Sequence, residues 1–118
     1  MSASMNNILN KVEAIIQKYY YLVQAKKSVD DKLYKSYEKF LTFKSIEKDD
    51  KAHLVDDIKD FADKEVSLAL LVTYLISKKQ LINDIDDAEL KELYFEELEE
   101  VYNATLEVSK LYDQSKLE

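Results

Sequence analysis

His53 is the single histidine of the chain, and it is the side chain best suited to act as a general base near neutral pH. Asp57 lies four residues further on, where a helix would place its carboxylate beside the imidazole and could orient it. Such a site also needs a positioned nucleophile, and the sequence around His53 offers none. A histidine in the first turn of a helix is usually solvated, so we expect no catalysis here.

Several other chemistries are excluded by composition. The chain has no Gly, so it lacks the loops that cradle phosphates, and it has no Cys for thiolate-bound zinc. A di-iron bundle site needs two Glu-x-x-His motifs, which one histidine cannot supply. A calcium loop starting at Asp84 fails because Ala88 and Phe95 occupy ligand positions. The sequence therefore predicts a protein that is not an enzyme and holds no metal or cofactor.

Aromatic and basic residues alternate in one stretch, as in some nucleic-acid-binding surfaces. Tyr37 and Phe40 fall on the apolar side of a predicted helix, however, whereas Lys35 and Lys39 fall on the opposite side. Stacking and phosphate contacts would then not share a surface. The net charge of −7 also has the wrong sign, so we do not expect nucleic-acid binding.

Charge is distributed unevenly along the chain. Residues 1–48 contain nine lysines and five acidic residues, whereas residues 49–118 contain eight lysines and nineteen acidic residues. This asymmetry favours attraction between the two halves of the chain or a basic partner. The alternative is an ordinary solvated acidic surface.

The elements that must position any site are helices, because the chain contains neither Gly nor Pro. Apolar residues at helical spacing predict helices over residues 5–27, 30–46 and 50–80, and a fourth helix that begins after Asp84 or Asp86 and ends at about residue 114. The third helix is predicted to be continuous, with a bend at residues 64–67 as the alternative. Asn83 is the expected left-handed residue at its end.

Three apolar side chains are candidates for an interaction surface. The first helix carries Tyr19, Tyr20 and Tyr21 in succession, so Tyr21 must point away from the core if Tyr19 points into it. In the third predicted helix, the helical repeat places Leu71 and Tyr74 on the same side as Asp56 and Asp60, which come earlier in that helix. We expect Tyr21, Leu71 and Tyr74 to contact a partner or a second copy of the chain. The alternative is that they pack within the same chain.

The fourth helix carries the acidic candidates. Glu92, Glu96 and Glu99 lie opposite its apolar side, which includes Tyr94 and Leu98. If this face is more than a solvated surface, it would attract a basic partner.

These patterns predict an all-α fold with one domain over residues 1–118. We expect a four-helix bundle with antiparallel up-down-up-down order and long third and fourth helices. No secretory signal is evident, and the most apolar run, over residues 66–76, is too short to cross a bilayer, so a cytoplasmic protein without membrane association is expected.

The function predicted from the sequence is that of a protein-protein interaction module. It would be an adaptor, an inhibitor or an assembly subunit that self-associates as a homodimer through the apolar half of the third helix. The alternative is an acidic decoy or regulator that occupies a basic or nucleic-acid-binding site on another protein.

Overall fold

The computed structural model describes residues 3–26, 55–60 and 63–117. These residues form α1 (Ala3–Lys26), α4 (Lys64–Asp84), α5 (Ala88–Leu117) and a short helical segment over residues 55–59. Within these ranges there is no strand, so the predicted all-α class is confirmed there. The helix predicted over residues 30–46 and His53 lie outside the described residues. The four-helix bundle with its up-down-up-down order therefore stays a prediction.

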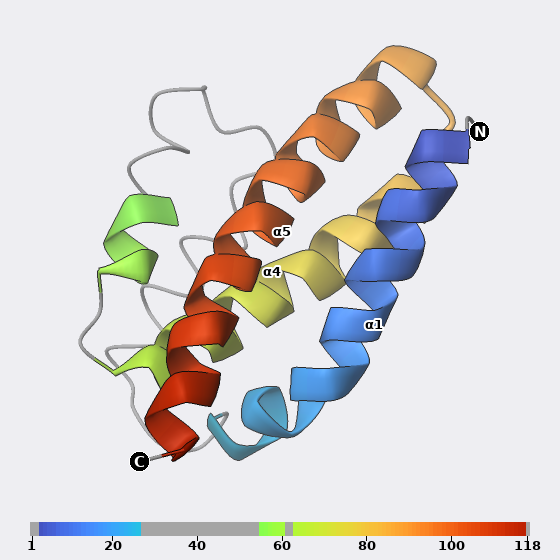
Figure 1. The fold of residues 1–118 in the computed structure, drawn as a ribbon. Helices are drawn as coiled ribbons and strands as arrows, with labels where there is room; N and C mark the ends of the chain where they lie inside the picture. The colour runs from blue at the N-terminus through green and yellow to red at the C-terminus, as the bar shows by residue number, and fades with distance from the viewer. Residues whose placement is uncertain (1–2, 27–54, 61–62, 118) are drawn as a thin grey trace.

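α4 is the central element, and α1 and α5 both pack against it (Figure 1). α1 and α5 contact each other much less. Residues 66–72 of α4 are all buried, which explains why this stretch is apolar around most of the helix. The three helices share one hydrophobic core.

The helix predicted over residues 50–80 is wrong as a continuous element. The chain leaves the helix at Asp60, and Asp63 has an extended backbone with φ −84° and ψ 104°. The Asp63 carboxylate accepts hydrogen bonds from the backbone N–H groups of Glu65, at 3.0 Å, and Val66, at 3.4 Å, and so caps α4. Ser67 Oγ then donates to the Ile58 carbonyl at 2.7 Å, which ties the short segment to α4.

The connection between α4 and α5 is short. α4 continues through Asn83 to Asp84, and no described residue has a positive φ, so the expected left-handed Asn83 is wrong. Ile85 is extended instead, with φ −92° and ψ 130°. Asp87 begins the next helix, because its carboxylate accepts from the N–H groups of Glu89 and Leu90 at 2.9 and 3.2 Å. The helix predicted to begin after Asp84 or Asp86 therefore begins slightly later, at Ala88.

The apolar sides predicted for the first and fourth helices face the core. In α1, Val12, Ile15, Tyr19 and Leu22 are buried. In α5, the buried residues at the predicted spacing are Tyr94, Leu98, Val101, Thr105, Val108 and Tyr112. Leu90, which the same spacing predicts on this side, is instead 43% exposed. No helix in the described ranges is long and apolar enough to cross a membrane.

Candidate functional site

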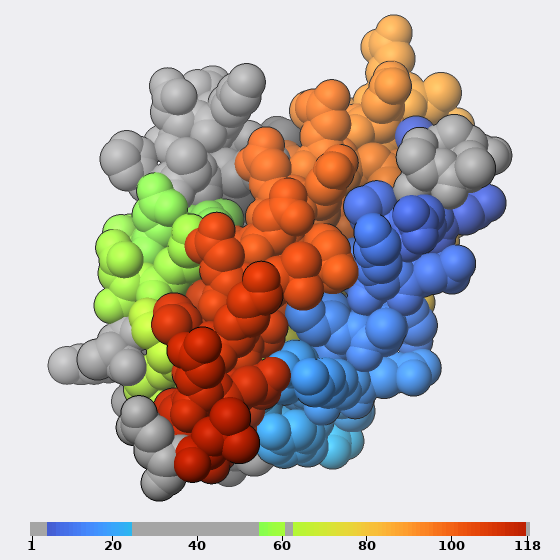
Figure 2. All heavy atoms as spheres, in the orientation of Figure 1, coloured from blue at the N-terminus to red at the C-terminus, as the bar shows by residue number. Residues whose placement is uncertain are grey.

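A groove of about 380 Å³ lies between the beginning of α1 and the first half of α5. These two stretches are side by side on the face shown in Figure 2, with α1 in dark blue and α5 in orange. The groove is lined by residues of both helices, namely Met5, Asn7, Ile8, Glu92, Phe95, Glu96 and Glu99. Its volume is at the lower end of the range of roughly 300–1,000 Å³ that is typical of ligand pockets. It is large enough for a few side chains of a bound segment.

All three acidic candidates lie along this groove. Glu92, Glu96 and Glu99 are exposed, as predicted, because the positions i, i+4 and i+7 follow one side of a helix. No ion pair between described residues uses any of these carboxylates. They are therefore available to a cation from outside this part of the chain.

The groove also contains an apolar surface next to the carboxylates. Phe95 is buried, and Met5 and Ile8 are partly buried side chains that pack against the core. Carboxylates beside apolar side chains suit a ligand that is basic on one side and apolar on another. A ligand recognised only through its positive charge would not need apolar side chains in the groove.

Tyr21 lies elsewhere, toward the other end of α1. Its side chain is 55% exposed, which agrees with the prediction that it points away from the core. Its hydroxyl is 3.1 Å from the hydroxyl of Tyr112, so the ring is held against the second half of α5. Tyr21 does not line the groove, and the structure does not join it to the acidic candidates.

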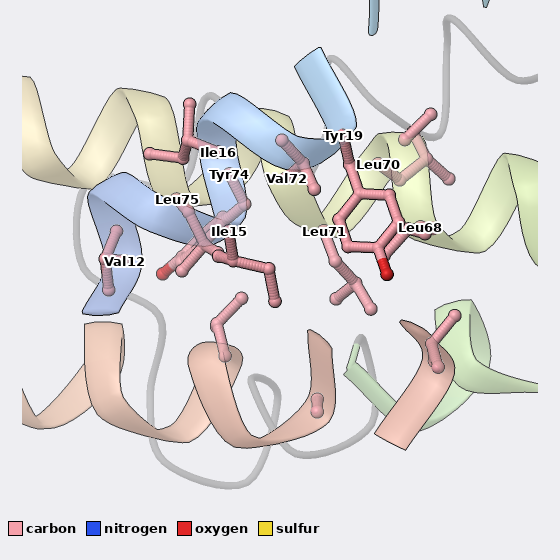
Figure 3. Close-up of a cluster of buried hydrophobic side chains, with 14 of the residues drawn as sticks. Val12, Ile15, Ile16, Tyr19, Leu68, Leu70, Leu71, Val72, Tyr74 and Leu75 are labelled. Carbon is pink, nitrogen blue, oxygen red and sulfur yellow. The ribbon is translucent and has the colours of Figure 1, made fainter. Parts of the chain in front are cut away.

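Leu71 and Tyr74 are not surface residues. Their exposed fractions are 0% and 1%, so the expectation that they form an exposed interface is wrong. The reason is that α4 packs against both α1 and α5, so more than one side of this helix is buried. Figure 3 shows both side chains among the buried residues of α1 and α4.

The sequence reasoning missed a buried ion pair between α4 and α5. Lys78 Nζ is 2.8 Å from Glu97 Oε2, and both side chains are only 3% exposed. The Lys78 ammonium has no hydrogen bond of good geometry, but it lies 4.4 Å from the ring centroid of Tyr94 and 5.4 Å from that of Tyr74. Ionic and cation–π attraction therefore hold this ammonium in the interior.

Tyr74 completes this buried cluster. Its hydroxyl donates to Glu97 Oε2 at 3.3 Å. Burial, together with the negative charge of Glu97, raises the pKa of Tyr74 far above its usual value. Periodicity could have flagged Glu97, which lies three residues after Tyr94 and four before Val101, on the apolar side of α5. We assign the cluster a structural role, because its side chains are almost fully buried.

Metal chemistry has no support in the described ranges. No group of three His, Cys, Asp or Glu side chains comes together there in a way that could hold an ion.

Comparison with known proteins gives no information about the function of this chain. No protein-family model matches the chain, and no curated protein and no solved structure is significantly similar to it.

Proposed function

We propose that this chain is a protein-binding module that holds a basic segment of a partner in the groove between α1 and α5. The observation that carries the proposal is the meeting of Glu92, Glu96 and Glu99 with the apolar side chains of Met5, Ile8 and Phe95 in one groove. The three carboxylates supply charge complementarity and the apolar surface supplies contact area. Binding of this kind requires no catalytic group.

The charge of the surrounding helix supports the choice of a basic partner. α5 contains eight acidic residues and three lysines, so the field near the groove is negative. Such a field accelerates the encounter with a positively charged partner and weakens as the salt concentration rises. The earlier idea of self-association through Leu71 and Tyr74 is not retained, because both are buried within the chain.

The experiment compares the wild-type chain with the variant Glu92→Gln/Glu96→Gln/Glu99→Gln. A labelled peptide rich in lysine and leucine is titrated by fluorescence anisotropy at low and at physiological salt. We expect the wild type to bind it and the variant to bind about tenfold more weakly, from about 0.5 kcal/mol for each exposed charge pair. Equal binding by both proteins would remove the groove from consideration.

A matched control is available outside the groove. The variant Asp56→Asn/Asp57→Asn/Asp60→Asn changes the net charge by the same amount, and its three exposed carboxylates lie on the short helical segment and the turn that follows. We expect its affinity for the peptide to stay within about twofold of the wild type. An equal loss in this control would show that only the overall charge matters.

The acidic-decoy alternative uses the same glutamates but does not need the apolar surface. Met5→Gln preserves side-chain length while removing an apolar group from the groove. A protein-binding groove should lose affinity for the lysine–leucine peptide in this variant. A decoy that acts by charge alone should not, provided that circular dichroism and thermal unfolding show the variant to be folded.

A further inference from the structure

We infer that the segment held in the groove is an amphipathic α-helix with lysine or arginine at positions i, i+4 and i+7 and apolar residues on the neighbouring side. This inference rests on the proposed function, and it specifies the conformation and the pattern of the partner. The first support is the spacing of the carboxylates. Glu92, Glu96 and Glu99 extend about 10 Å along α5, at a rise of 1.5 Å per residue, and a second helix alongside repeats that spacing.

The second support is the nature of the groove walls. Both walls are helices, α1 and α5, whose backbone groups beyond the first turn are hydrogen-bonded within each helix. One common way in which an extended peptide gains affinity is to pair its backbone with a sheet edge, and these walls offer none. A bound helix satisfies its own backbone groups and brings only side chains to the groove.

The third support is the arrangement of the three described helices. α1 and α5 both pack on α4 but contact each other little, and the groove lies where the beginning of α1 meets the first half of α5. Met5 and Ile8 are three residues apart, so they present one side of α1 to this groove, which Phe95 of α5 also lines. Leucines on one side of a docked helix would meet these residues while its basic residues meet the carboxylates of α5.

Three synthetic peptides of equal length and charge test the inference. The first has lysines at i, i+4 and i+7 and leucines on the neighbouring side. The second has the same composition in an order that destroys this pattern, and the third is the first with a central proline. We expect the first peptide to bind about tenfold more tightly than the other two and to gain helical circular dichroism on binding. This gain should be lost with the variant Glu92→Gln/Glu96→Gln/Glu99→Gln and kept with the Asp56, Asp57 and Asp60 control.

The outcomes separate the inference from the proposed function. If the proline peptide binds as tightly as the first and still needs the three glutamates, the helical partner is overturned while the basic partner stands. If no peptide binding depends on the glutamates, both fail. Light scattering of the wild type without peptide tests whether a second copy of the chain occupies the groove instead. A dimer that dissociates in the glutamate variant would place a second copy in the groove and overturn the inference.

Discussion

Two of the polar clusters between helices differ in burial more than in chemistry. In the centre, Lys78 and Glu97 form an ion pair with both side chains 3% exposed. Toward the end of α1, Lys18 and Asp113 form another at 3.5 Å, with side chains 64% and 47% exposed. In each cluster a tyrosine hydroxyl also donates to the carboxylate, from Tyr74 in the first and from Tyr19 in the second.

The comparison teaches that the surroundings decide what such groups contribute. Water competes for the exposed Lys18 and Asp113, so their attraction adds little to stability. Water cannot reach Lys78 and Glu97, so each buried charge is stabilised mainly by the other. A shift of α4 relative to α5 would leave both charges buried without a counter-charge. We therefore regard the central pair as the contact that specifies the alignment of α4 with α5.

The largest effect is expected when the central pair is broken. Glu97→Leu leaves the Lys78 ammonium buried without its counter-charge and the Tyr74 hydroxyl without its acceptor. We expect the free energy of unfolding, measured in urea, to fall by about 3–5 kcal/mol. The variant Tyr74→Phe/Lys78→Met/Glu97→Leu replaces these three polar side chains together and should return to within about 2 kcal/mol of the wild type. A stable single variant would contradict the importance of the pair.

Alkaline pH should act on the same cluster. The pKa of Tyr74 is raised by burial, so the folded chain keeps this hydroxyl protonated at a pH where the unfolded chain loses the proton. Its contribution to stability is complete below about pH 10 and falls by about 1.4 kcal/mol per pH unit above it. Tyr74→Phe should flatten this decline, while the exposed Tyr20→Phe serves as the matched control. Urea unfolding curves between pH 9 and pH 11 would contradict this prediction if the free energy of unfolding falls equally in the wild type and in Tyr74→Phe.

The second cluster should respond less to the loss of its tyrosine hydroxyl. Tyr19 donates to both carboxylate oxygens of Asp113, at 3.0 and 2.9 Å, and burial of the ring raises the pKa of Tyr19. The acceptor is half exposed, so water can replace the lost bond. We expect Tyr19→Phe to lower the free energy of unfolding by about 1 kcal/mol in the same urea assay. A loss comparable to that of Glu97→Leu would erase the contrast between the two clusters.

The smallest effect is expected at the exposed ion pair. Lys18→Gln removes the charge that faces Asp113 while keeping most of the side chain. Because both partners are solvated, the free energy of unfolding should change by less than about 0.5 kcal/mol. The pair would be stronger than its exposure implies if the change exceeded about 1 kcal/mol and diminished with added salt.

Local pattern was a good guide wherever one side of a helix faces the core. The spacing of apolar residues correctly placed Tyr19 inside and Tyr21 outside, and it placed Glu92, Glu96 and Glu99 on the surface. These assignments need only the helical repeat and one buried side. Pattern failed in α4, where Leu71 and Tyr74 are buried on a side predicted to be exposed, because a helix flanked by two others has more than one buried side.

The helix boundary near Asp60 shows a second kind of failure. Apolar spacing continues from Val55 through Ile58 to Val66, so it gave no sign of an interruption. Asp63 was the available signal, since aspartate is a favoured capping residue, but several other aspartates nearby could have served equally well. The hydrogen bond from Ser67 to the Ile58 carbonyl connects residues on both sides of the break and depends on the fold.

The sequence by itself determined the helical class and the acidic stripe on α5, because composition and the helical repeat act over a few residues. Only the tertiary structure decided that Lys78 and Glu97 meet in the interior, since the two residues belong to different helices and nothing in either helix specifies the partner. The groove has the same origin. Its carboxylates could be predicted, but its apolar side chains Met5 and Ile8 come from α1, which packing of both helices on α4 brings beside α5.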